Sequence, residues 1–90
     1  MTTQRLIAIN NEKGLHARAS AKFVELVENY DADAWVSKDG DTVAGDSIMG
    51  LLMLAASNGT QIHVKTEGPQ DEALADALEQ LIKGRFGEDR

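Results

Sequence analysis

The spacing of the apolar residues changes several times along this chain, and that change limits the fold more than any other feature. Three short segments alternate apolar and polar residues, which is the pattern of half-buried β-strands. Two longer segments repeat apolar residues every three or four positions, which is typical of amphipathic helices. Strands are therefore predicted at residues 5–10, 33–38 and 60–66, and helices at residues 17–30 and 69–83.

Two shorter elements complete the pattern. Asp39-Gly40 is a hairpin-turn signal, so a brief strand is expected at residues 42–44. Ser47 is a favourable N-cap, so a short helix is expected directly after it. The order strand, helix, strand, strand, helix, strand, helix predicts an α+β domain with one antiparallel sheet and helices on one face. Spacing alone leaves the order of the strands open.

The same periodicities assign side chains to the core or to solvent. Residues expected to face the core are Ile7, Ile9, Phe23, Val24, Leu26, Val27, Tyr30, Ala34, Val36, Ile62, Val64, Ala73, Leu74, Ala77, Leu78, Leu81 and Ile82. Residues expected on the opposite, solvated face of the sheet are Asp33, Trp35, Ser37, Gln61, His63 and Lys65.

The last helix has clear signals at both ends. Pro69 is expected in its first turn, where Asp71 and Glu72 match the positive end of the helix dipole. Lys83 and Gly84 are expected to end it. The remaining residues, 85–90, are expected to fray.

Length and composition limit the class of protein. With 90 residues and 42% hydrophobic content, the chain can bury one modest core, so residues 1–90 are predicted to form a single domain. The absence of cysteine excludes disulfides, zinc–thiolate clusters and thiol nucleophiles. The first residues lack the long apolar core of a signal peptide, and the richest apolar run, residues 48–56, is too short to span a bilayer. We therefore expect a cytoplasmic protein that does not insert into membranes.

The charges are distributed unevenly. The net charge of −6 argues against nonspecific binding of nucleic acid, because the phosphate backbone favours basic surfaces. Residues 1–22 carry four basic and one acidic residue (4 − 1 = +3), whereas residues 23–90 carry five basic and fourteen acidic residues (5 − 14 = −9). The basic end surrounds His16, which suggests a local site for an anion or an acidic partner.

The short helix after Ser47 is apolar on nearly every side. A two-layer domain of this size has no room to bury all of its large side chains, although deep packing of the whole helix stays an alternative. We expect Leu51 and Leu54 in the core. The remaining residues, Ile48, Met49, Leu52 and Met53, are expected to meet a partner, and methionine suits a surface that repacks.

Ser47 itself has two possible roles. As an N-cap it stabilises the helix start, whatever else it does. It is also a candidate phosphorylation site, because a phosphate at a helix N-terminus is tolerated while its charge disturbs a neighbouring apolar contact.

His16 stands where a helix begins, in the segment GLHARAS. The first backbone N–H groups of a helix, including those of Ala17 and Arg18, lack intrahelical acceptors and suit a phosphate. Gly14 allows a tight loop, Leu15 could anchor it, and the Arg18 guanidinium matches phosphate oxygens. A neutral imidazole is nucleophilic without a catalytic base, so an exposed His16 could carry a phosphoryl group. The alternative is an incidental surface histidine.

The sequence resembles the histidine-containing phosphocarrier family, HPr, of the bacterial phosphoenolpyruvate-dependent phosphotransferase system. The motifs that carry the resemblance are GLHARAS at 14–20, SIMGLLML at 47–54 and TQIHVKTEGPQDEAL at 60–74. It implies an open-faced β-sandwich, with a four-stranded antiparallel sheet in the order 1-4-2-3 covered on one face by three helices. LLML and EGPQ are more similar to the nitrogen-related branch, NPr, whereas SIMG is more similar to the kinase-regulated branch.

The resemblance also implies a function. His16 would accept a phosphoryl group at Nδ1 from phosphorylated enzyme I and pass it to a histidine of an enzyme IIA, with Arg18 orienting the phosphate. The protein would be a carrier rather than an enzyme, monomeric and without a cofactor or metal. Ser47 would be the regulatory serine for an HPr kinase/phosphorylase. The implied partner surface comprises Ala17, Ser20, Ala21, Ile48, Met49, Leu52 and Met53.

The sequence departs from the family pattern at three positions. Ala19 replaces the usual proline after the arginine, so the first turn of the helix is less preset. Asp46 and Gly50 stand where many sugar-type members have lysine, which makes the docking surface less basic. Both a carbohydrate-uptake and a nitrogen-type pathway stay open.

The sequence leaves two other functions open. In one, phosphorylation of Ser47 is the main event and the protein is a regulatory partner that transfers nothing, although the retained His16 argues against it. In the other, His16 and His63 bind a metal, which is weak because a zinc site usually needs three or four ligands.

Overall fold

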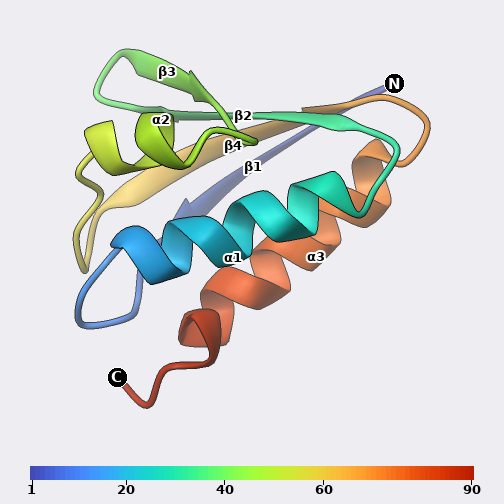
Figure 1. The fold of residues 1–90 in the computed structure, drawn as a ribbon. Helices are drawn as coiled ribbons and strands as arrows, with labels where there is room; N and C mark the ends of the chain where they lie inside the picture. Colours follow the sequence, from blue (N-terminus) through green and yellow to red (C-terminus); the bar gives the residue numbers. More distant parts are fainter.

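The computed structural model describes all 90 residues. The elements in chain order are β1 (Thr2–Ala8), α1 (Ala17–Glu28), β2 (Asp33–Lys38), β3 (Asp41–Ala44), α2 (Ile48–Met53), β4 (Gln61–Glu67) and α3 (Asp71–Lys83), followed by the 3-10 turn η1 (Arg85–Gly87). Every predicted strand and helix is present, in the predicted order (Figure 1).

The four strands form one sheet in the order β1-β4-β2-β3, and every neighbouring pair is antiparallel. The helices lie on one face of this sheet and leave the other face open (Figure 1). This architecture confirms the α+β class and the strand order that the family resemblance implied.

The faces of the strands agree with the predicted alternation. The inward residues of the strands, Ile7, Ala34, Val36, Ile62 and Val64, are all buried. On the open face, the ammonium group of Lys65 lies 5.6 Å from the ring centroid of Trp35. At the turn between β2 and β3, Asp39 and Gly40 both have positive φ (51° and 87°), as a two-residue hairpin of this type requires.

The first strand and the first helix have ends that differ from the prediction. The first strand was expected at residues 5–10 but spans Thr2–Ala8, because its pairing partner β4 sets its length. Ile9 lies beyond the strand yet is buried, and its N–H donates to the carbonyl of Thr60. α1 ends at Glu28 rather than Tyr30, and Tyr30 packs against the core from the following turn.

The start and the buried stripe of α3 also differ from expectation. Pro69 precedes the N-cap residue Gln70, so it lies outside the first turn, whereas Asp71 and Glu72 occupy that turn as predicted. Ala73 is exposed and Ala75 is buried. The stripe is centred on Leu74, Leu78 and Ile82, spaced by four residues, so Ala75 rather than Ala73 flanks it on the core side.

The prediction that residues 85–90 fray was wrong. The side chain of Phe86 is fully buried in the main core, and the Lys22 ammonium donates to the Phe86 carbonyl at 2.6 Å. Arg85, Phe86 and Gly87 all have left-handed backbone conformations (φ 57°, 55° and 79°) that turn the chain back past the end of α3. The chain after α3 is therefore a packed element.

No helix in this structure combines the length and the apolar content that crossing a membrane would require.

Candidate functional site

The loop before α1 is held by backbone geometry. Gly14 has φ +66°, and a Cβ atom there would lie 2.4 Å from the carbonyl oxygen of Ala56. The N–H of Leu15 donates to that carbonyl at 2.8 Å, and the Leu15 side chain is buried. The predicted tight turn at Gly14 and anchor at Leu15 are confirmed. Together they fix the position of the next residue, His16.

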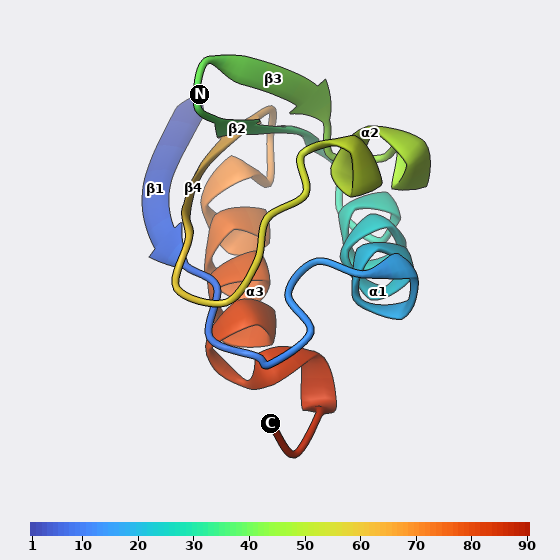
Figure 2. The ribbon, with the colours of Figure 1, turned by 90° about the vertical axis from the view of Figure 1, so that its left-hand side faces the viewer.

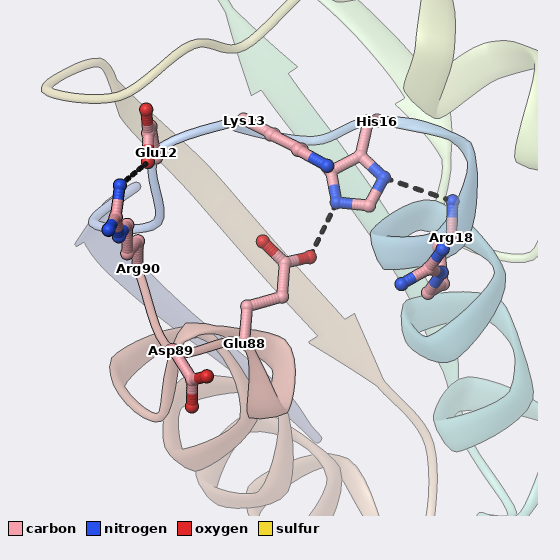
Figure 3. Close-up of a pocket in the computed structure, with 7 residues that line it drawn as sticks. All are labelled: Glu12, Lys13, His16, Arg18, Glu88, Asp89 and Arg90. Carbon is pink, nitrogen blue, oxygen red and sulfur yellow. Dashed lines mark hydrogen bonds and ion pairs between the residues drawn. The ribbon is translucent and has the colours of Figure 1, made fainter.

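His16 is the N-cap of α1, and both of its ring nitrogens are engaged (Figure 3). Nδ1 accepts a hydrogen bond from the Arg18 backbone N–H at 3.2 Å. Nε2 lies 2.5 Å from Oε2 of Glu88. The side chain is 25% exposed, so the ring is less open than predicted, and the Arg18 N–H is capped by the ring rather than unpaired.

These contacts determine the tautomer of a neutral His16. A neutral imidazole has one nitrogen that donates and one that accepts. Because an amide N–H can only donate, Nδ1 must carry the lone pair. The proton is then on Nε2 and is donated to the Glu88 carboxylate. The ring therefore presents a nucleophilic Nδ1 beside the helix N-terminus.

Glu88 is held by a buried amide. Asn11 is fully buried, and its Nδ2 donates to Oε1 of Glu88 at 3.1 Å and to the carbonyl of Gly14 at 2.8 Å. The hydrogen bond from Asn11, followed by the bond to His16 and the nearby charge of Lys13, lowers the pKa of Glu88 against the opposing effect of burial. The Glu88 carboxylate is therefore ionised at neutral pH.

A shallow polar pocket surrounds the ring (Figure 3). Its lining residues are Glu12, Lys13, His16, Arg18, Glu88, Asp89 and Arg90. The predicted gathering of basic charge is only partly present, because two of the basic residues are engaged elsewhere. Arg5 pairs with Asp76 and Glu79 of α3 at 2.8 and 2.7 Å. The Lys22 ammonium donates a hydrogen bond to the carbonyl of Phe86.

The surface of α2 agrees with the prediction in most respects. The Ser47 hydroxyl caps the helix by accepting from the Gly50 N–H at 3.0 Å. Leu51 and Leu54 are buried. The four other large apolar residues are 36–79% exposed, which rules out deep packing of the whole helix; they are Ile48, Met49, Leu52 and Met53. We call these four residues the α2 patch.

α2 lies beside α1, so the helix that carries the α2 patch is a direct neighbour of the helix that begins at His16 (Figure 2). Among the α1 residues expected in the partner surface, Ala17 is exposed and Ala21 is half-buried. Ser20 is instead fully buried and its hydroxyl donates to the carbonyl of Leu15, so its side chain is unavailable to a partner. Its place in the partner surface was implied by the family resemblance alone.

The two histidines have separate partners. His63 lies on the open face of the sheet, where its Nε2 is 2.8 Å from the side-chain oxygen of Gln4. His16 contacts Glu88 at the start of α1. No group of three or more potential metal-ligating side chains occurs in the structure.

Comparison with known proteins decides the family. A family model described as "PTS HPr component phosphorylation site" matches residues 3–84. The chain belongs to the HPr family. It is 48% identical over 82 residues to the phosphocarrier protein HPr of Neisseria meningitidis, covering 91% of this chain and 92% of that protein. It is 43% identical over 91 residues to the phosphocarrier protein NPr of Klebsiella oxytoca, covering 99% of this chain and all of that protein.

The fold of this HPr-family chain is also that of a solved HPr structure. The crystal structure of HPr-C-His from Thermoanaerobacter tengcongensis superimposes with a TM-score of 0.93 and 38% sequence identity, covering 98% of this chain and 99% of that one. The resemblance inferred from the three sequence motifs is thereby confirmed.

The sequence analysis did not predict three residues of the site, namely Asn11, Phe86 and Glu88. The match to the HPr family model ends at residue 84, before Phe86 and Glu88. A usable signal was present, because Phe86 is a large aromatic residue two positions after Gly84 in a chain with only two phenylalanines. Such a residue favours packing over fraying. Asn11 and Glu88 gave no comparable signal, because each acts only through a contact with distant parts of the chain.

Proposed function

We propose that this protein carries a phosphoryl group on His16, accepting it from phosphorylated enzyme I and passing it to a histidine of an enzyme IIA. In this role the protein is a substrate of larger enzymes and catalyses nothing alone. The observation that carries the proposal is the placement of His16 Nδ1 at the N-terminus of α1, beside the Arg18 amide, while Nε2 is held from the other side.

The transfer step follows from this geometry. The Nδ1 lone pair attacks phosphorus, the P–N bond to the donor histidine breaks, and its electron pair returns to the donor ring. The Nε2 proton stays in place. Once Nδ1 binds phosphorus it no longer accepts from the Arg18 N–H, so that amide is free to donate to a phosphoryl oxygen at the positive end of the helix. The exposed Arg18 guanidinium supplies a second set of donors.

Onward transfer is the same step in reverse. A histidine of enzyme IIA attacks the phosphorus, and His16 leaves as a neutral imidazole with its lone pair on Nδ1. No base and no cofactor are needed in either direction. A monomer in the cytoplasm suffices for this relay.

The α2 patch supports a docking role. The helix that carries its four exposed apolar side chains is a direct neighbour of α1, so a partner that contacts them also approaches His16. A phosphate on Ser47, added by an HPr kinase/phosphorylase, keeps oxygen acceptors at the N-cap and places negative charge next to Ile48 and Met49. Apolar contacts near that charge are then harder to desolvate, so docking weakens.

A nitrogen-type phosphorelay is the second candidate, supported by the 43% identity to an NPr over nearly the whole chain. The chemistry at His16 is the same, and only the acceptor differs. Phosphorylated protein offered to purified sugar-type and nitrogen-type enzyme IIA distinguishes the two, because faster transfer identifies the acceptor class. A regulatory partner controlled only by Ser47 would instead bind its target tightly as a phosphoserine while His16 proved inert.

The carrier role is tested by labelling. With enzyme I, Mg²⁺ and labelled phosphoenolpyruvate, the wild-type protein should gain one acid-labile phosphate. His16→Ala should abolish labelling, and His63→Ala is the matched control that should retain it. Labelling that persists in His16→Ala, or that never appears in the wild type, contradicts the proposal.

A further inference from the structure

The end of the chain supplies a carboxylate to the phosphate-accepting ring. Residues 85–90, which we call the tail, leave α3 and turn back toward the loop before α1 (Figures 1 and 3). Glu88 is 72 residues from His16 in sequence, yet its Oε2 lies 2.5 Å from the ring Nε2. Its side chain is only 17% exposed, so the contact belongs to a packed region.

Several contacts hold the tail in this position. Phe86 is fully buried, Lys22 binds the Phe86 carbonyl, and Asn11 binds the second oxygen of Glu88. Arg85 and Phe86 have a left-handed backbone conformation, which is unfavourable for residues other than glycine. Without the anchoring contacts, these two residues would relax to a more favourable conformation. These contacts together hold the Glu88 carboxylate next to Nε2 of His16.

We propose that Glu88 is a positioning residue for phosphoryl transfer, whose carboxylate holds the Nε2–H of His16 so that Nδ1 faces the incoming phosphorus. This inference rests on the proposed carrier function. It explains why a carboxylate is anchored at the ring by a buried amide, and it assigns a role to a segment that the family-model match leaves out.

The chemistry favours a carboxylate at this place. When the P–Nδ1 bond forms while Nε2 keeps its proton, the ring acquires a positive charge. Glu88, which is held ionised by Asn11, offsets that charge. A carboxylate that fixes an imidazole and stabilises its cationic form is the same device that orients histidine in catalytic triads.

Glu88 does not obstruct the reaction, because it contacts the ring nitrogen opposite to the one that reacts (Figure 3). The phosphoryl group is expected on the side of the Arg18 amide. The tail can therefore stay docked through both transfer steps.

The test compares Glu88→Ala and Glu88→Gln with Glu72→Ala as a charge-matched control. Glu72 is an exposed glutamate in the first turn of α3, and it does not line the pocket around His16. The first readout is the proton resonance of His16 Nε2–H in ¹⁵N-labelled, unphosphorylated protein. The wild type and Glu72→Ala should show it, because a proton held by a carboxylate exchanges slowly with water. Glu88→Ala should lose it, and Glu88→Gln, which keeps an oxygen acceptor, should retain it in weakened form.

The second readout is the rate at which phosphorylated enzyme I transfers its phosphoryl group. Glu88→Ala should lower kcat/KM by about tenfold, with Glu88→Gln in between and Glu72→Ala within about twofold of the wild type. An unchanged resonance and rate in Glu88→Ala, or equal losses in Glu72→Ala, would overturn the inference. A wild-type protein that shows the resonance but accepts no phosphate would refute the carrier function instead, so the two failures are distinguishable.

Discussion

At the scale of single residues, the site depends on a few positions where no other side chain fits well. Gly14 combines a left-handed backbone with a close approach to the Ala56 carbonyl. His16 combines an N-cap role with two different ring contacts. Gly14 has a structural role, whereas His16 combines a structural role with its proposed chemical one, so substitutions at the two positions separate these roles.

Gly14→Ala should destabilise the protein and displace His16. The added Cβ meets both a strained φ and a carbonyl oxygen at 2.4 Å, so we expect a loss of about 3 kcal/mol in the free energy of unfolding. Gly40→Ala is the matched control, because Gly40 has φ +87° but nothing within 4 Å of its Cβ position, and should cost only about 1 kcal/mol. Urea unfolding of both variants measures the difference. Equal losses would show that the contact with Ala56 is unimportant.

Two variants of Ser47 distinguish its capping role from the effect of a negative charge at this position. Ser47→Ala removes the acceptor for the Gly50 N–H and should cost about 1 kcal/mol of stability. Ser47→Asp keeps an N-cap acceptor and adds a negative charge, so its stability should stay near that of the wild type while phosphoryl acceptance from enzyme I slows. Thermal unfolding and transfer rates of the two variants check this. If Ser47→Asp transferred at the wild-type rate, charge at Ser47 would have no regulatory effect.

The free energy of unfolding at acidic pH should depend on the ionisation of Glu88. Its lowered pKa means that the folded state favours the carboxylate, so the stabilisation is complete above the ordinary value of 4.5 and is lost as pH falls below it. The groups around it are Asn11, His16 and Lys13, with Glu12, Arg18, Asp89 and Arg90 lining the same pocket. The difference in unfolding free energy between the wild type and Glu88→Gln should therefore shrink between about pH 5 and pH 3. A difference that stays constant over this range would contradict an ionised Glu88 carboxylate at the site.

At the scale of elements, the tail and α2 differ most from what sequence patterns describe. The predicted strands and long helices follow from periodicity, because each buries one regular face. α2 was predicted correctly as half-exposed because its apolar residues exceed what one face can bury. The tail has no periodicity, and its structure depends on one aromatic residue in the core and on hydrogen bonds to α1 and to the loop before it.

Phe86 tests whether the tail is an integral element. Phe86→Ala should cost about 3–5 kcal/mol of stability, which is the range for a large buried aromatic side chain, and the milder Phe86→Leu should cost less. Met53→Ala is the control, because Met53 is 79% exposed and should change stability by less than about 0.5 kcal/mol. Chemical denaturation measures all three. A small loss in Phe86→Ala would mean that the tail is not packed as described.

At the scale of the whole molecule, the sequence predicted the architecture better than the electrostatics. The fold class, the element order and the inward faces followed from local patterns, and the strand order required the family resemblance. The basic end of the chain was expected around His16, but Arg5 pairs with α3 across the β1 contact, and the tail brings acidic groups to the site. Such pairings depend on distant segments meeting in space, and local composition contains no record of them.

The overall arrangement places three features of the proposed site on neighbouring elements. The start of α1 carries His16, the adjacent α2 carries the apolar patch and Ser47, and the tail carries Glu88 (Figures 2 and 3). The open face of the sheet lies apart from them, with Trp35 and His63 on it.

The most direct test of the central claim is nuclear magnetic resonance of ¹⁵N-histidine-labelled protein after phosphorylation by enzyme I and phosphoenolpyruvate. We expect ³¹P coupling to Nδ1 of His16, together with a large shift of the Arg18 amide resonance as its acceptor changes from the ring to the phosphoryl group. Coupling to Nε2 of His16 or to a nitrogen of His63, or an Arg18 amide that does not respond, would contradict the account.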